Sequence, residues 1–318
     1  MTTTDIPGPA SPAPTESLGK LGDRIIRGIS FGAGVLILVT LAAVALFLFT
    51  EAWPTFGADP HEMSGGDTFW QYVSPLLFGT IWAAFLAMLM AVPLAVMVAL
   101  FISHYAPRRL SVTLGYFIDL LAAIPSVVYG LWGIAVLAPI LSDSVLPWLE
   151  DNLGFLPFFA GPASTSGRAM ITAAAVLAVM ILPITTAIAR EVFLQTPRLH
   201  EEASLALGAT KWEMIRQAVI PYGRSGVISG AMLGLGRALG ETMAVAIILS
   251  PADLITFNVI SNQNPNTIAA NIALKFPESA GLEVNRLIAT GLVLFAVTFA
   301  VNAGARRIAN AGFSGADG

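Results

Sequence analysis

The sequence predicts an all-α, polytopic membrane protein with six transmembrane helices. Of its 318 residues, 56% are hydrophobic and only 11% are charged, and the mean hydropathy is +0.76. Soluble domains carry about 25% charged residues, so this composition excludes an ordinary soluble protein. A bilayer-spanning helix needs about 20 apolar residues. Six stretches meet that length: residues 27–50, 75–103, 116–141, 169–194, 225–250 and 286–305.

Three of the six stretches contain a proline, and further segments lie outside the predicted spans. Pro93, Pro125 and Pro183 lie inside the second, third and fourth stretches, where we expect kinks. The N-terminal segment is rich in Pro, Ser and Thr, which predicts disorder. The expected organisation is a disordered cytoplasmic tail over residues 1–25, a transmembrane domain over 26–310 with a cytoplasmic loop at 195–223, and a short cytoplasmic tail over 311–318.

The distribution of basic residues predicts the orientation. With the N-terminus inside, twelve of the sixteen Lys and Arg residues fall in cytoplasmic segments. Three of them, Arg168, Lys275 and Arg286, fall outside, and Arg237 lies within the fifth span. Since basic loop residues stay on the cytoplasmic side, we expect both termini in the cytoplasm.

Several kinds of chemistry are excluded by residue type. The chain has no cysteine and three scattered histidines, so we expect no disulfide, no thiolate chemistry and no metal site. It also lacks the GxxxxGK[ST] loop that binds nucleotide phosphates, because its only Gly-Lys pair, Gly19-Lys20, has Pro14 at the leading position. If this protein uses ATP, a separate subunit must bind it.

The fifth span contains "GRALGETMAV", residues 236–245, with two formal charges. Arg237 and Glu241 are four residues apart, about one helical turn. On a continuous helix they would share one stripe with three glycines, Gly226, Gly230 and Gly234. A glycine stripe lets another helix approach closely, so we expect a packed seam. The pair could fix helix register, or Arg237 could attract an anion while Glu241 restrains it; charges inside a span favour the functional reading.

The third span holds "YFIDLLAAIPSVVYGLWG", residues 116–133. Pro125 leaves a backbone carbonyl without its helical donor. Ser126 and Tyr129 can supply hydroxyl groups nearby. Hydroxyls and free backbone groups at membrane depth suit a solvated pathway, although they also occur in inert packing.

The longest cytoplasmic loop is predicted to contain two short helices. Thr196 and Pro197 can start the first, Gly208 interrupts it, and the second runs to Pro221. The apolar face of the second helix is formed by Trp212, Ile215, Val219 and Ile220. Such helices could rest on the lipid surface or offer a docking surface to a partner, and the pattern alone leaves both open.

"EEASLALGATKWEMIRQAVIP" resembles the EAA loop of ABC importer permeases, which reads Glu-Ala-Ala, three residues, Gly, nine residues, Ile, one residue, Leu-Pro. This chain departs from the pattern only at Ser204, Ala218 and Ile220. The resemblance implies the type I ABC importer (MetI-like) permease fold. It further implies that the loop docks on a cytosolic ATPase through Glu202, Ala203, Gly208, Ala209 and Pro221.

"LAAIPSVVYGLWG" and "GRALGETMAV" are similar to segments of the phosphate-specific transport permeases, and the Glu-Thr-Met-Ala ending is similar to the PstC type. This resemblance covers about residues 75–305. It implies that Arg237 and Glu241 are needed for phosphate transport, with Ser126, Tyr129 and Thr242 along the pathway. The chain is then a transport subunit and not itself an enzyme.

The same resemblance implies the rest of a complex in a bacterial plasma membrane. The expected partners are a PstA-like second permease, two PstB-like ATPase subunits that bind ATP and Mg²⁺, and an external PstS-like phosphate-binding protein. This chain would need no cofactor of its own and would contact lipid but no nucleic acid. Three alternatives remain: a permease for molybdate or sulfate, a secondary transporter or channel that uses the charge pair as a proton relay, and a membrane scaffold.

Overall fold

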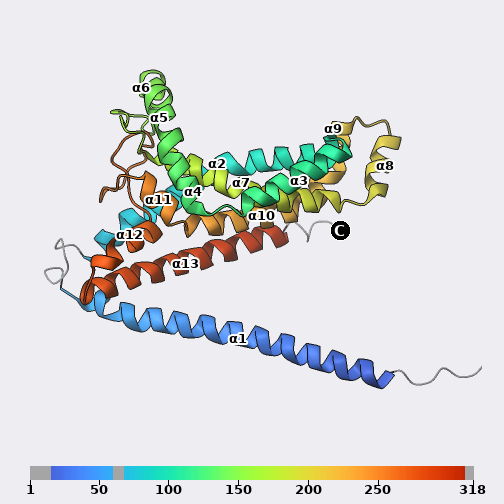
Figure 1. Ribbon diagram of the computed structural model, residues 1–318, viewed down its shortest axis with the longest axis horizontal. Coiled ribbons are helices and arrows are strands. Elements are labelled where there is room, and N and C mark those ends of the chain that lie inside the picture. Colours follow the sequence, from blue (N-terminus) through green and yellow to red (C-terminus); the bar gives the residue numbers. More distant parts are fainter. Residues whose placement is uncertain (1–15, 60–67, 312–318) are drawn as a thin grey trace, which may run out of the picture. The chain divides into compact units, whose positions relative to one another are not determined.

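The computed structural model describes residues 16–59 and 68–311, and within these ranges the regular structure is helical apart from a single bridge between Pro251 and Asn264. The α-helices (Figure 1) are α1 (Glu16–Gly57), α2 (Phe69–Leu100), α3 (Arg108–Ala122), α4 (Ser126–Trp132), α5 (Ala138–Ile140), α6 (Leu146–Leu153), α7 (Met170–Leu194), α8 (Arg198–Ala206), α9 (Lys211–Met214), α10 (Ile220–Leu239), α11 (Met243–Ile248), α12 (Ile268–Lys275) and α13 (Leu282–Ala311). Short π-helical turns occupy Phe101–Tyr105, Gly133–Leu137, Leu141–Val145 and Ile215–Val219.

Within the described residues, five helical segments are long and apolar enough to cross a membrane, which makes this a multi-pass membrane protein. They are Gly22–Gly57, Phe69–Tyr105, Ser126–Leu153, Met170–Leu194 and Leu282–Ala305. The predicted span at residues 225–250 is not among them. The prediction of a continuous helix there is wrong, because α10 ends at Leu239 and the chain resumes as α11 at Met243.

The third predicted span is also wrong in its boundaries. Residues 116–122 belong to α3, which ends before Pro125, and the apolar segment long enough to span begins only at Ser126. Pro125 has φ −59° and ψ 139°, an extended conformation that stops a helix. By contrast, Pro93 and Pro183 lie within the continuous helices α2 and α7.

The N-terminal helix is longer than the sequence suggested. α1 begins at Glu16, so residues 16–25 are helical and the prediction of disorder is wrong for them. Residues 1–15 lie outside the described part of the chain. So do residues 312–318, while Ala311 is the last residue of α13. Residues up to Thr50 form a unit of their own, a single helix whose apolar side chains are exposed, Ile25 to Phe49 among them.

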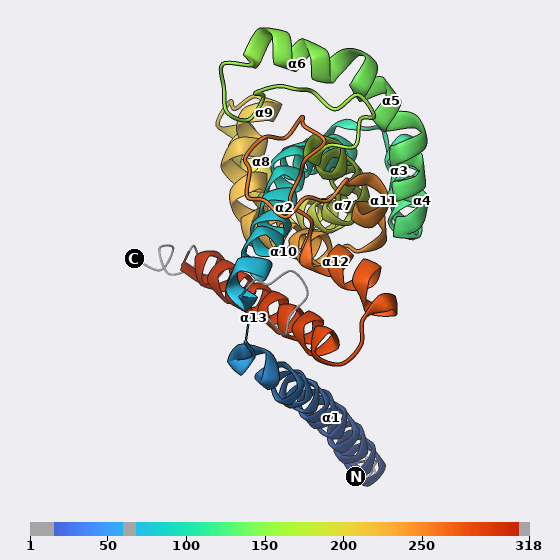
Figure 2. The same ribbon diagram turned by 90° about the vertical axis from the view of Figure 1, so that its left-hand side faces the viewer.

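The core lies where α2, α7 and α10 run side by side, as both views show (Figures 1 and 2). α2 contributes small residues at every fourth position: Ala83, Ala87, Ala91, Ala95 and Ala99, each at most 1% exposed. Residues four apart lie on one helical face. Small side chains there let backbones approach closely, which is how helices associate inside a bilayer.

The helices that follow the two breaks, α4 after Pro125 and α11 after the end of α10, pack against one another. A Cβ atom built on Gly130 of α4 would lie 2.8 Å from the Ala244 Cα of α11. One built on Gly133 would lie 2.6 Å from a Val176 methyl group of α7 and 3.0 Å from Ile248 Cδ1. Glycine at these positions therefore allows α4 to sit directly on α11.

Gly130→Ala should destabilise the protein by about 1–3 kcal/mol, because the new methyl group would overlap backbone atoms that have no room to move. The measurement is thermal unfolding of the detergent-purified protein. Gly304→Ala on α13 is the matched control, since a Cβ there meets nothing within 4 Å. Equal melting temperatures for the two variants would contradict the close packing of α4 on α11.

Candidate functional site

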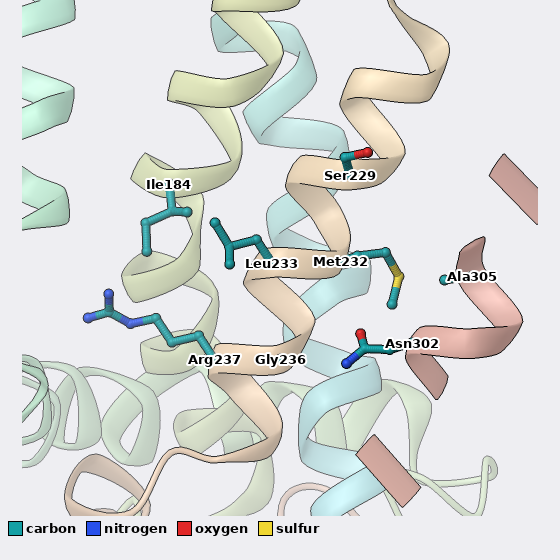
Figure 3. Close-up of a pocket in the computed structure, with 8 residues that line it drawn as sticks. All are labelled: Ile184, Ser229, Met232, Leu233, Gly236, Arg237, Asn302 and Ala305. Carbon is teal, nitrogen blue, oxygen red and sulfur yellow. The ribbon is translucent and has the colours of Figure 1, made fainter. Parts of the chain in front are cut away.

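A cavity of about 650 Å³ lies beside α10 and is bordered by α7 and α13 (Figure 3). Among the described side chains, its walls are mostly apolar, with one charged residue, Arg237. Two polar side chains, Ser229 and Asn302, complete the hydrophilic lining. The full lining is Ile184, Ser229, Met232, Leu233, Gly236, Arg237, Asn302 and Ala305.

Arg237 extends from the last turn of α10 on the side of Ile184, whereas Met232 and Asn302 lie on the other side of this helix (Figure 3). The side chain of Arg237 is half-buried. An arginine in apolar surroundings costs about 2.5–3.5 kcal/mol even on the gentler insertion scale. The cavity gives the guanidinium group access to water or to an anion.

Glu241 lies in the break between α10 and α11. Its side chain is 7% exposed. Its Oε1 accepts a hydrogen bond from the Ala244 backbone N–H at 3.0 Å, in the first turn of α11. A carboxylate at this position satisfies an N–H without a helical partner and complements the positive end of the helix dipole.

The expected pairing of the two charges is wrong. Within the described residues, no nitrogen of Arg237 lies within 4.0 Å of a Glu241 oxygen. The prediction assumed a continuous helix, on which residues four apart are neighbours, but the helix ends at Leu239. Thr242 lies in the same break, and its hydroxyl donates to the Gly240 carbonyl at 3.1 Å.

The three predicted packing glycines face α7. A Cβ atom on Gly226 would overlap the Val192 side chain. One on Gly230 would lie 3.1 Å from Ile188 Cβ, and one on Gly234 would lie 2.9 Å from Thr185 Oγ1. α10 and α7 are therefore in close contact along this glycine stripe, but Glu241 does not belong to the stripe because it follows the helix.

Tyr129 forms a hydrogen bond across the break before α4. Its hydroxyl donates to the Leu121 carbonyl at 2.8 Å, the carbonyl that would have accepted from residue 125 if that residue were not proline. Tyr129 is 7% exposed, and its neighbour Gly130 packs against Ala244 of α11. Ser126 is half-buried at the start of α4. The fold thus brings α4, which follows one helix break, against α11, which follows the other.

The predicted docking loop forms two short helices at the end of the bundle opposite α6 and α12 (Figure 1). α8 and α9 are joined through Gly208, whose φ of +89° is in the left-handed region that favours glycine. Glu202, Ala203 and Gly208 are exposed, and Ala209 is half-buried.

Two details of this loop differ from expectation. Trp212 is 55% exposed, whereas Ile215 and Val219 are fully buried, so Trp212 is not part of the buried apolar surface of this segment. The helix also does not stop at Pro221, which lies exposed in the first turn of α10. A proline is tolerated in the first turn of a helix because a backbone N–H at that position has no helical acceptor. A π-helical turn, Ile215–Val219, joins α9 to α10 without a gap.

The loop is tied to the turn that follows α2. His104 Nε2 lies 3.5 Å from Glu201 Oε1 of α8. The Lys211 ammonium group of α9 lies 4.8 Å from the centre of the Tyr105 ring. The residue types alone could not have revealed these contacts, because about a hundred positions separate the partners along the chain.

Ser229 and Asn302 are polar cavity residues that the sequence analysis missed; for Asn302 a signal was available. A lone amide in the last apolar span was the available signal, since polar residues in spans face the protein interior or a watery path. In the described residues no group of three or more His, Asp or Glu side chains could hold a metal ion. The cavity therefore offers one cation and two neutral hydrogen-bonding groups, a lining suited to an anion.

Comparison with known proteins identifies the family. Residues 91–311 match the binding-protein-dependent transport system inner membrane component family. This chain belongs to that family. The chain is therefore a transport component rather than an enzyme, and the resemblance of its loop to importer permeases is confirmed.

Relatives within this family match nearly the whole chain. A protein of Mycobacterium tuberculosis named phosphate transport system permease protein PstC 2 is 43% identical over 99% of this chain and 100% of its own length. The PstC proteins of Mesorhizobium japonicum and Haemophilus influenzae are 39% and 38% identical, over 90% and 83% of this chain and 89% and 85% of their own.

The fold of this family member also occurs in a solved structure. A chain from a bacterial ABC transporter involved in the import of the acidic polysaccharide alginate aligns with a TM-score of 0.56 and 17% identity, over 91% of this chain and 99% of that chain. The two chains share a permease fold.

The capping box at the start of α9 provides a pH-dependent test of the loop. The Thr210 backbone N–H and hydroxyl both donate to Glu213 Oε2 at 2.7 Å. These bonds hold the pKa of Glu213 below its ordinary value of 4.5. Because the folded-state pKa is lowered, the stabilisation is present above pH 4.5 and is lost as the pH falls through the lowered value.

Glu213→Gln should therefore speed amide hydrogen exchange in α9 at pH 7. The difference from wild type should shrink as the pH falls below about 4. Comparing the two proteins at each pH cancels the intrinsic pH dependence of exchange. A difference that persists unchanged at low pH would contradict a role for the ionised carboxylate.

Proposed function

We propose that this chain is the membrane-spanning permease subunit of an ATP-driven inorganic phosphate importer. Relatives at 38–43% identity over most of the chain carry the name phosphate transport system permease protein. The observation that carries the proposal within the structure is Arg237, the one charged group lining the cavity. Arginine suits phosphate because its planar guanidinium can donate two parallel hydrogen bonds to an oxyanion.

The separation of Arg237 from Glu241 favours this assignment. Glu241 accepts from the first turn of α11, so its negative charge is committed to the helix terminus. The positive charge of Arg237 then remains available to an anion that enters the cavity. Ser126, Tyr129 and Thr242 lie at the two helix breaks and line the approach, although the hydroxyl groups of Tyr129 and Thr242 are already donating to backbone carbonyls.

The loop of α8 and α9 is the docking surface for the ATPase. Glu202, Ala203 and Gly208 present exposed atoms at the end of the bundle, with Ala209 and Pro221 beside them. Since α9 continues into α10 through a π-helical turn, movement of the loop would reach the helix that carries Arg237. ATP and Mg²⁺ would be bound by the ATPase, and this chain would hold no cofactor.

The complete transporter would contain a second permease of the PstA type, two PstB-type ATPase subunits and an external phosphate-binding protein of the PstS type. The transmembrane domain of this chain would extend over residues 26–310, with the docking loop at 195–223. Both termini would be cytoplasmic in a bacterial plasma membrane, because the basic residues concentrate on that side.

A permease for another oxyanion, molybdate or sulfate, is the second candidate, since a lone arginine cannot distinguish tetrahedral anions by charge. Uptake of labelled phosphate in competition with each anion separates these candidates. Stand-alone secondary transport is disfavoured by membership in a family of binding-protein-dependent systems.

Arg237→Gln should lower phosphate uptake at least about tenfold while leaving complex assembly intact, because a hydrogen bond to a charged group is worth about 1.5–3 kcal/mol. Uptake is measured in cells that lack their native phosphate importer. Arg224→Gln, which removes a cation from the other end of the same helix, should transport normally. Normal uptake by Arg237→Gln would exclude Arg237 from the pathway.

Gly208→Val should weaken ATPase docking, because a β-branched residue is strained at a φ of +89°. Co-purification of the ATPase with the permease measures docking. Gly208→Asn is the matched variant, since asparagine tolerates the left-handed region, and it should retain the ATPase. Equal recovery of the ATPase with both variants would argue that the turn does not shape the docking surface.

A further inference from the structure

The short helix α11 ends with backbone carbonyls that receive no hydrogen bond from the backbone four residues later. In a continuing helix, Ile247 would accept from residue 251, but residue 251 is a proline and has no N–H. Ile248 would accept from Ala252, whose N–H instead donates to the Asn264 carbonyl at 2.8 Å. Buried carbonyls without partners are costly in a membrane protein, so a donor from elsewhere is needed.

Arg168 supplies both hydrogen bonds. Its Nη2 donates to the Ile247 carbonyl at 2.9 Å, and its Nε donates to the Ile248 carbonyl at 3.3 Å. The guanidinium group lies half-buried about 80 residues earlier in the chain. A cation at this position also complements the negative end of the helix dipole.

Both ends of α11 are therefore held by side chains of opposite charge. Glu241 accepts from Ala244 N–H at the start of the helix, and Arg168 donates at its end. Gly130 of α4 packs on the side of α11, against Ala244. A helix of six residues is too short to be stable alone, so these contacts decide its position.

The backbone around Arg168 is itself anchored. Ser164 N–H donates to the Ile260 carbonyl at 2.8 Å, and Ile171 N–H donates to the Val259 carbonyl at 2.9 Å. Val259 N–H donates in turn to the Phe158 carbonyl at 2.9 Å. The segment before α7 and the segment after α11 thus form one hydrogen-bonded unit, from which the guanidinium group reaches α11.

We propose that Arg168 is a positioning residue that holds α11 in place and thereby sets the break in which Glu241 and Thr242 lie, next to Arg237. Arg168 acts through backbone carbonyls and does not contact the transported anion. The consequence for transport rests on the proposed function of Arg237, whereas the mechanical role of Arg168 stands on the contacts alone.

The absence of cysteine from this chain allows a direct test. Val245 of α11 is 1% exposed, so a cysteine placed there by Val245→Cys should react slowly with a water-soluble maleimide in the assembled complex. Adding Arg168→Gln should raise the labelling rate at least about tenfold, because α11 loses two charge-assisted bonds and opens more often. The control is Ala189→Cys in α7, which is 0% exposed, packs in a separate cluster with Phe193 and Met214, and should remain slow with either residue at position 168.

Two further variants separate positioning from simple loss of charge. Lys275→Gln removes an exposed cation whose ammonium group lies 4.9 Å from the centre of the Tyr72 ring and should leave labelling at position 245 unchanged. Arg168→Lys keeps the charge but lacks the planar fork, so it should give an intermediate rate. Phosphate uptake should fall with Arg168→Gln and not with Lys275→Gln.

The outcomes distinguish this proposal from the proposed function. Unchanged labelling at position 245 in Arg168→Gln would overturn the positioning role, as would equal increases at positions 245 and 189. If Arg237→Gln transports phosphate normally, the pathway assignment fails, yet the labelling rates still decide the role of Arg168.

Discussion

The pairing of backbone polar groups at two helix breaks is the constraint on which the rest of this structure depends. A buried N–H or carbonyl without a hydrogen-bond partner is costly, so a helix break is stabilised where side chains replace the lost bonds. Tyr129 donates to the Leu121 carbonyl before α4. Glu241 accepts from the start of α11, and Arg168 donates to its end. Three polar side chains thus make the interruptions stable and place them together.

Close packing of small residues makes this arrangement rigid. The alanine stripe of α2 lies in the core with α7 and α10, and the glycines of α10 lie directly on α7. Gly130 brings α4 onto α11. Glu241 is hydrogen-bonded to the start of α11. Arg237 lies at the wall of a cavity, and no described acidic side chain forms an ion pair with it. Under the proposed function, that charge is the group that would attract an anion.

The two ends of the bundle are connected through one helix. α9 passes through the π-helical turn Ile215–Val219 into α10, whose twenty residues extend about 30 Å. The exposed loop of α8 and α9 lies at one end of this path and Arg237 at the other. Met214, Ile215 and Val219 are buried against Phe193 and Leu100, so a displacement of the loop would be passed to the core rather than absorbed locally.

The sequence by itself determined the membrane class and the family, and of the residues that line the cavity it singled out Arg237. Composition, the spacing from Glu202 through Gly208 to Pro221 and the charged segment at 236–245 are local signals that a single chain carries openly. It did not determine where the helices break. Pro93 and Pro183 continue their helices while Pro125 stops one, and α10 ends before Gly240 although the sequence of residues 225–250 predicted one continuous span. Only the tertiary structure decided these points, because a break is tolerated where a distant donor or acceptor reaches it. Arg168 lies about 80 positions from the carbonyls it satisfies, and no periodicity in the sequence records that contact.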